Sequence, residues 1–189
     1  MKKSTITRRD PTPAPKPAGH EVQGYGHSVR HPLALDATVC NSSIDALNQL
    51  LADFITLRDL YRKHHWQVAG PTFYPLHLLF DKHYGEVDKL VDEVAERVQI
   101  LGGVSIAMGA DTAELTTIPR PPKGREVAAD QIGRLLHAHE VILKEARAMV
   151  SRSTEIGDDG TSDLITSRVI RLGEVQVWFL FQHVIPSTK

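Results

Sequence analysis

Apolar residues recur at helical spacing in four stretches of the chain, and glycine and proline separate the stretches. In the first stretch the apolar residues that share one helix face are Leu47, Leu50, Leu51, Phe54 and Leu57. Ser42, with Asp45 three positions later, fits the box of side chains that caps a helix N-terminus. Gly70 and Pro71 end the pattern. We therefore predict a helix from about residue 42 to residue 66.

The other three stretches predict three further helices. The second runs from about residue 74 to residue 101, which is roughly 40 Å at 1.5 Å per residue, and Gly102 ends it. Later periodicity predicts helices over about residues 125–153 and 161–183, with a plain turn at residues 157–160. Residues 104–124 are rich in proline, so we expect a crossover with a short helix near residues 111–115.

The pattern predicts an all-α protein. No stretch shows the period-two alternation of a strand, a glycine-rich nucleotide loop or an internal repeat. Four helices with one long crossover between the second and the third describe a ferritin-like four-helix bundle, although many bundles share that outline.

The chain divides into a tail and one domain. Residues 1–35 hold five prolines, several glycines and few bulky apolar groups, so they bury too little surface to offset the entropy of ordering. We interpret them as a flexible basic tail, and residues 36–189 as the helical domain. The first nineteen residues contain one acid, Asp10, against the basic residues Lys2, Lys3, Arg8, Arg9 and Lys16.

Composition limits the classes of function. Lys plus Arg (22) and Asp plus Glu (23) nearly cancel, so the body offers no global positive field for nucleic acid. The apolar runs fall short of the ~18 residues of a membrane span, and the prolines stand where a signal peptide needs its apolar stretch. We expect a cytoplasmic protein. Cys40 is the single cysteine and is interpreted as a small core residue.

Candidate metal ligands concentrate in and around the second predicted helix. His77 and Asp81 are four residues apart, as are Asp92 and Glu96, so each pair lies on one helix face. Imidazole and carboxylate together suit Fe(II). Either pair alone is also what an ordinary solvated face or ion pair shows. His65, at the end of the first helix, is placed to add a further ligand.

The two pairs cannot bind the same ion within one chain. Asp81 and Asp92 lie ~16 Å apart along the helix axis, yet eleven residues at 100° each return them to the same face. If two copies of the helix pack antiparallel about a two-fold axis, the first pair of one copy meets the second pair of the other. Gly85, near the midpoint, would let the two backbones approach closely. No Glu-x-x-His motif of a site within one bundle is present.

These motifs resemble the Dps family of mini-ferritins. Residues 64–71 read HHWQVAGP, His77 precedes Asp81 by four positions, and residues 92–97 read DEVAER. The similarity spans roughly residues 40–184, including Trp178 near the end of the fourth helix. It implies a hollow homododecamer whose sites take His65, His77 and Asp81 from one subunit and Asp92 and Glu96 from its two-fold partner, as the spacing independently requires.

The resemblance also implies a ferroxidase activity. In that family Fe(II) is oxidised, preferentially by hydrogen peroxide rather than dioxygen, and is stored in the cage as a ferric mineral, which protects against oxidative damage. Zn(II) or Mn(II) at the same ligands stays an alternative, because these donors bind several divalent ions. Trp66 adjoins the site and either intercepts an oxidising radical or fills space between helices.

A cage that chiefly binds DNA is the alternative from another functional class. Residues 1–19 are the dense basic cluster outside the folded body, so any binding would be nucleoid-associated, sequence-independent and sensitive to salt. A solubilising arm explains the same composition.

Three weaker signals complete the prediction. Asp158, Asp159 and Asp163 are placed to cap the fourth helix. The resemblance to Dps implies that they also line a three-fold pore that draws cations inward, and the two roles can coexist. By analogy with some family members, an extra tail metal site would use His20, His27, His31 and Asp36. Four other histidines lack complementary ligand spacing and are interpreted as surface or hydrogen-bonded core residues; they are His83, His137, His139 and His183.

Overall fold

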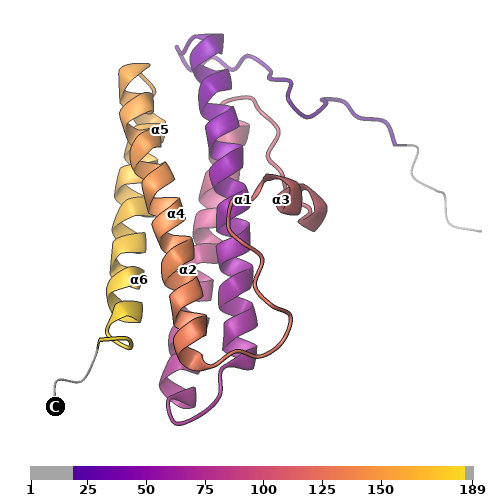
Figure 1. Ribbon diagram of the computed structural model, residues 1–189. Helices are drawn as coiled ribbons and strands as arrows, with labels where there is room; N and C mark the ends of the chain where they lie inside the picture. Colours follow the sequence, from indigo (N-terminus) through magenta and orange to yellow (C-terminus); the bar gives the residue numbers. More distant parts are fainter. Residues whose placement is uncertain (1–18, 186–189) are drawn as a thin grey trace, which may run out of the picture.

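Helices α1 (Ala37–Gln67) and α2 (Phe73–Ile100) form an antiparallel pair (Figure 1). The computed structural model describes residues 19–185. A crossover containing the short helix α3 (Gly109–Leu115) leads to α4 (Ala128–Glu155). The fourth long helix has three parts, namely α5 (Asp159–Leu164), the π-helical segment η1 (Ile165–Ile170) and α6 (Arg171–Phe181). Residues 19–185 contain no strand, so the predicted all-α bundle with a helix in its crossover is confirmed.

Helix α1 begins more than one turn before Ser42, so the predicted capping box is wrong. The N-cap residue is Asp36, and Ser42 lies inside the helix with its hydroxyl buried and without a hydrogen-bond partner in the described chain. The longer helix is favoured because Leu35 and Cys40 pack against the core. Cys40 is therefore the partly buried core residue that the sequence predicts.

Helix α2 starts and ends within one residue of the prediction. Pro75 is its third residue, a position in the first turn where a backbone N–H has no intrahelical partner to lose. After the helix Gly102 adopts a φ of +89°, which favours glycine. A Cβ atom there would also collide with the carbonyl oxygen of Val29.

The N-terminal segment before α1 lies against the end of α2. The Val29 backbone N–H donates to the Gly102 carbonyl oxygen at 2.8 Å, and Gln23 Nε2 donates to the same oxygen at 3.0 Å. His31 Nδ1 donates to the carbonyl oxygen of Ile100 at 2.9 Å. Part of the predicted flexible tail is thus held on the body by hydrogen bonds. Residues 1–18, which hold the five basic tail residues, lie outside the described part of the chain.

The second half of the bundle differs from the prediction in two places. Helix α4 starts at Ala128 rather than near residue 125, because Glu126, ahead of it, binds back to the helix through Arg134 Nε at 2.8 Å and Gln131 Nε2 at 2.7 Å. The predicted turn at residues 157–160 shrinks, because Asp158 caps α5 and Asp159 is already helical. The π-helical segment η1 was not expected from the sequence.

The core lies between the four long helices. The fully buried apolar side chains include Leu50, Leu57, Phe80, Leu135 and Leu180, and burial of each stabilises the fold by about 1.5–3 kcal/mol. No helix among residues 19–185 has the length and apolar character that crossing a bilayer requires.

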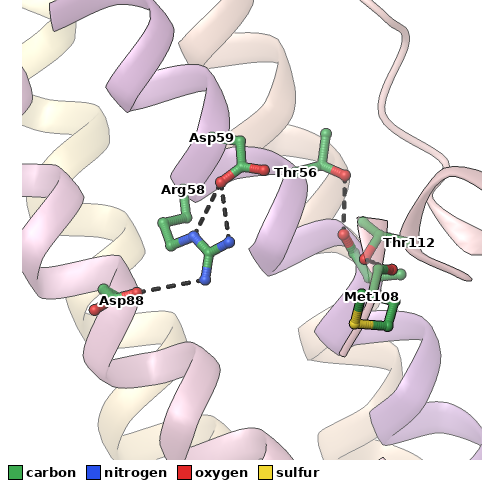
Figure 2. A network of polar contacts seen from close by, with 7 residues as sticks. Thr56, Arg58, Asp59, Asp88, Met108 and Thr112 are labelled. Carbon is green, nitrogen blue, oxygen red and sulfur yellow. Dashed lines mark hydrogen bonds and ion pairs between the residues drawn. The ribbon is translucent and has the colours of Figure 1, made fainter. Parts of the chain in front are cut away.

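Arg58 connects α1 to α2 at the surface of this pair. Figure 2 shows its guanidinium group between Asp59, 3.0 Å away, and Asp88 of α2, 3.4 Å away. On another side of α1, Thr56 Oγ1 bonds Thr116 Oγ1 of the crossover at 2.9 Å. The Arg58–Asp88 pair thus links α1 to α2, which carries most of the predicted ligands, and the Thr56 bond links α1 to the crossover.

Candidate metal centre

Four of the five predicted ligands lie along α2, and the fifth lies beside them on α1. His77 and Asp81 are in the N-terminal half of α2, whereas Asp92 and Glu96 are near its C-terminal end. His65 is in the last turn of α1. The structure brings His65 and His77 into contact, with Asp81 beside His65, and leaves Asp92 and Glu96 as a second half-site.

The rings of His65 and His77 hold each other in a fixed orientation. Nδ1 of His65 bonds the carbonyl oxygen of His77 at 2.9 Å, and Nδ1 of His77 bonds the carbonyl oxygen of His65 at 2.9 Å. The rings stack with centroids 3.8 Å apart. Because a carbonyl oxygen only accepts hydrogen bonds, both Nδ1 atoms carry the proton and both Nε2 atoms present a free lone pair. Such second-shell bonds orient histidines for metal binding.

Asp81 adds a carboxylate to this pair of imidazoles. Its Oδ1 atom lies 3.9 Å from His65 Nε2, and its side chain is 55% exposed. Arg62 Nη1 lies 3.4 Å from the same oxygen, so the carboxylate is balanced by a cation from α1. The first half-site therefore offers two nitrogen donors and one oxygen donor.

Asp92 and Glu96 differ from the other acids near them. Glu93 binds Arg168 at 2.5 Å and Asp88 binds Arg58 at 3.4 Å. Asp92 and Glu96 are exposed, and neither has an ion-pair partner among residues 19–185. Their charge is not neutralised within the described chain, so both remain available to a cation.

A single chain does not assemble a complete site. The two half-sites lie ~16 Å apart on one helix, and within the described residues no group of three or more His, Cys, Asp or Glu side chains is arranged to hold a metal ion. Apart from the neighbouring backbone of α2, no atom of residues 19–185 lies within 4 Å of the place where a Cβ atom at Gly85 would be. A shared site about a two-fold axis stays a prediction.

Comparison with known proteins identifies the family. Residues 44–184 match the family described as Ferritin-like domain. The structure of DpsC from Streptomyces coelicolor is 46% identical, has a TM-score of 0.88, and is matched over 90% of this chain and 99% of that chain. The chain is a Dps-family protein. The resemblance predicted from its motifs is therefore confirmed.

Other Dps-family relatives match at greater distance. Dps from Thermosynechococcus elongatus is 32% identical with a TM-score of 0.75, over 80% of this chain and 95% of that chain. The nutrient stress-induced DNA-binding protein of Nostoc sp. is 33% identical over 81% of this chain and 83% of its own length. The Dps protein of Vibrio cholerae, 27% identical with a TM-score of 0.77 over 82% of this chain and 96% of that chain, is described as one of the ferritin-like diiron-carboxylate proteins.

Trp66 of this Dps chain is exposed next to the first half-site. Its side chain is 70% exposed, and the guanidinium carbon of Arg62 lies 5.9 Å from the centroid of its ring. Trp66 therefore does not fill space between helices of its own bundle. Its role in radical interception stays a prediction.

Asp158 caps the N-terminus of α5, as the capping interpretation predicts. It is buried, it accepts a hydrogen bond from the Thr161 N–H at 3.1 Å, and it pairs with Arg97 at 2.6 Å. Although burial raises the pKa of this carboxyl, hydrogen bonds from Ser43 and Thr161 and the charge of Arg97 lower it below its usual value overall. These partners occupy the carboxylate within the described chain, so the structure supports the capping role of Asp158, and its pore role stays a prediction.

Asp159 and Asp163 are exposed, so they remain candidates for the acidic entry. The tail metal site stays a prediction: Nδ1 of His31 is bonded to α2, and Asp36 is the N-cap residue of α1 without a side-chain capping bond. Within residues 19–185 no cluster of potential ligands forms around them.

The sequence allowed His83 and His139 to be hydrogen-bonded core residues, but it did not indicate that they gather around one tyrosine in the bundle interior. His64, His83 and His139 are buried, and His83 and His139 contact Tyr61. Burial lowers the pKa of His139 to about 3 and that of His83 to about 4. His139 lies at helical spacing from the buried apolar residues of α4. This spacing could have indicated from the sequence that His139 is buried.

Proposed function

We propose that this Dps-family chain oxidises Fe(II) at sites shared between two subunits and stores the product as a ferric mineral inside a cage. Each site would take His65, His77 and Asp81 from one subunit and Asp92 and Glu96 from the two-fold partner. The cage would be a homododecamer, and hydrogen peroxide would be the preferred oxidant.

The observation that carries this proposal is the reciprocal hydrogen bonding of His65 and His77. It leaves the Nε2 atoms of two stacked rings free to bind a metal ion, and the exposed Asp81 carboxylate lies 3.9 Å from Nε2 of His65. An imidazole and carboxylate donor set fits ferrous ion. The unneutralised charges of Asp92 and Glu96, which face the same side of α2, supply the complementary half.

The ligands would divide the chemistry between them. Carboxylates neutralise the cation and favour Fe(III), which is the harder ion. The two imidazoles, fixed through Nδ1, orient the substrate ion without a cost of reordering. Binding of Fe(II) would displace Arg62 from Asp81. Until then Arg62 balances the charge of the exposed carboxylate.

Iron oxidation by assembled protein tests the proposal. Fe(II) and stoichiometric hydrogen peroxide are mixed, and the absorbance of the ferric product is followed in wild type, in Asp92→Asn/Glu96→Gln and in Asp88→Asn. Asp88 is a matched control because it is an exposed acid of α2 that already pairs with Arg58. We expect the double variant to lose at least about tenfold in initial rate and the control to keep its rate. Equal rates in all three contradict the proposal.

The same ligands bind other divalent ions, so the metal is tested separately. Titration with Zn(II) or Mn(II) in competition with Fe(II) measures the order of affinities. Zn(II) is expected to bind more tightly than Fe(II) by the general order of metal affinities, so that result by itself does not contradict the proposal. Absence of any peroxide-dependent iron oxidation is the result that assigns the site to another metal.

DNA binding is a second function that the names of relatives favour. The Nostoc protein and a 31% identical relative from Bacillus anthracis are named for DNA binding and for DNA protection during starvation. We propose that any such binding of this chain uses residues 1–19, through phosphate contacts and with the avidity of many tails on one cage. Gel retardation of DNA by the full-length protein and by a variant lacking residues 1–19, at low and high salt, tests this proposal. Equal retardation by both proteins would show that residues 1–19 are not the DNA-binding segment.

A further inference from the structure

Tyr61 lies in the interior of the bundle between two histidines. Its side chain is completely buried. The phenol oxygen is 2.6 Å from Nε2 of His139 on α4 and 3.1 Å from Nδ1 of His83 on α2. The rings of both histidines meet the tyrosine ring edge-on, with centroids 5.8 Å and 5.3 Å away. None of the three residues belongs to the metal centre described above.

The positions of the protons follow from the hydrogen-bond count. A phenol has one proton to donate, so one ring accepts from Tyr61 and the other donates to it. The 2.6 Å contact fits an O–H donor and the 3.1 Å contact fits an N–H donor. Tyr61 then donates to His139 Nε2, and His83 Nδ1 donates to Tyr61. This leaves His83 Nε2 as a bare acceptor, and that atom lacks a partner within the described residues; the opposite arrangement would bury an unpaired N–H.

We propose that Tyr61 is a one-electron donor that reduces radicals formed from hydrogen peroxide and ferrous ion, with His139 as the acceptor of its proton. The Tyr61 O–H bond breaks as an N–H bond forms at His139 Nε2. The electron reduces a hydroxyl radical to hydroxide, which solvent then protonates. The products are a neutral Tyr61 phenoxyl radical and a His139 imidazolium. A second ferrous ion returns the electron and becomes ferric, and the proton returns from His139 to the phenoxyl oxygen.

The surroundings of Tyr61 favour coupled loss of proton and electron. Burial raises the pKa of Tyr61 well above its ordinary value, so the phenol stays protonated until it is oxidised. Burial lowers the pKa of His139 to about 3, so its ring is neutral at rest, and the imidazolium formed returns its proton readily. The Glu86 carboxylate, whose charge acts on Tyr61, offsets the positive charge left in the core.

Tyr61 is close to the first half-site but closed to solvent. It precedes His65 by one helical turn on α1, and residues four apart on a helix have Cβ atoms about 6 Å apart. An electron can cross this distance, whereas a diffusing radical cannot reach the buried phenol. The source of the oxidant rests on the function proposed above; the redox activity of Tyr61 does not.

The experiment uses a full-length variant in which Tyr61 is the single tyrosine, made by Tyr25→Phe, Tyr74→Phe and Tyr84→Phe. Metal-free protein is illuminated with a ruthenium tris-bipyridine sensitiser and persulfate, frozen, and examined by electron paramagnetic resonance. We expect a tyrosyl signal that disappears when Tyr61→Phe is added. We also expect it to lose most of its intensity with His139→Gln, which keeps a hydrogen-bond acceptor but not a base. No tyrosyl signal, or a signal indifferent to His139→Gln in correctly assembled protein, overturns the proposal.

A second arm replaces light with Fe(II) and hydrogen peroxide and follows iron oxidation in the same samples. A tyrosyl signal at Tyr61 during normal iron oxidation supports the proposal. Its absence during normal iron oxidation overturns the proposed role. If iron is not oxidised at all, the proposed ferroxidase function fails instead, and the photochemical arm alone decides whether Tyr61 is a redox-active residue.

Discussion

Arg97 of α2 and Asp158 at the start of α5 form a buried ion pair with 2.6 Å between Nη2 and Oδ1. The same carboxylate accepts hydrogen bonds from Ser43 of α1 at 2.6 Å and from the Thr161 hydroxyl at 2.6 Å. One side chain thus joins the first, second and fourth helices of the bundle.

Asp158→Asn should therefore destabilise the protein. Removing one charge of a buried pair typically costs about 3–5 kcal/mol, and urea unfolding of the variant beside wild type measures it. Because the pKa of Asp158 is lowered in the folded state, its contribution is present above the pKa of the unfolded chain and is lost as pH falls through the folded value. A loss below about 1 kcal/mol, as for an exposed pair, would contradict this account.

Asp159→Asn/Asp163→Asn, unlike Asp158→Asn, should leave stability nearly unchanged and instead slow iron uptake. These exposed acids change stability by no more than about 0.5 kcal/mol, but their removal should slow iron uptake if they form the acidic entry. Added salt should slow wild type toward the rate of the variant, because it screens the attraction. An unchanged uptake rate at low ionic strength would leave them with a capping role.

Mixed cages should regain activity if the metal centre is shared. His77→Ala/Asp81→Ala subunits and Asp92→Ala/Glu96→Ala subunits each lack one half-site. Random equal mixing makes half of the two-fold interfaces mixed, and one of the two sites at each mixed interface is intact. About a quarter of wild-type activity should return. Mixing His77→Ala with Asp81→Ala subunits, which are altered in the same half, is the control that should show no such gain.

Ionisation of Glu145 should lower the stability of the folded protein as pH rises toward and past neutrality. Burial, followed by the charge and hydrogen bonding of Asp53, raises the pKa of Glu145 to about 7. The neutral form is favoured in the folded state, so its contribution is full below the unfolded pKa and is lost as pH rises through about 7. Glu145→Gln should flatten the melting temperature measured between about pH 5 and pH 8. Parallel profiles for variant and wild type would refute the role of this pair.

His64→Leu should stabilise the protein. His64 is completely buried beside Phe80, and neither ring nitrogen makes a hydrogen bond of good geometry in the described chain, although the Gln131 side chain is near enough to oppose in part the lowering of the ring's pKa by burial. Each unpaired buried polar group costs about 1–3 kcal/mol, and leucine has a similar volume without that cost. Chemical denaturation measures the gain, with the exposed His137→Leu as a control that should not stabilise. Destabilisation by His64→Leu would mean that the ring has a partner in the assembled protein.

The sequence predicted the helices well and the end of each helix less well. Apolar periodicity located α2 to within one residue at each end, because the pattern stops where Gly102 follows the helix. It placed the start of α1 too late, since Ser42 resembles a cap but the packing of Leu35 and Cys40 extends the helix. Such tertiary contacts leave no local signal.

Residue spacing predicted the two ligand pairs of α2, because ligands four apart on a helix share a face. His65 was added from its place at the end of the first helix and from the resemblance to the Dps family. The His65 and His77 hydrogen bonds, by contrast, join two helices and are invisible to a one-helix argument. The pairing of Asp158 with Arg97 was missed for the same reason: the two residues are far apart in sequence and meet only in the folded bundle.

The π-helical segment η1 adds about one residue to the path of the fourth helix. Each residue of a regular helix turns the chain by about 100°, so α6 directs Gln176 and Leu180 into the core only with that extra residue in place. A chain shortened by one residue within Ile165–Ile170 would keep almost all of its helix content. It would nevertheless rotate α6 and present a surface other than the one that now exposes Trp178 and Phe181.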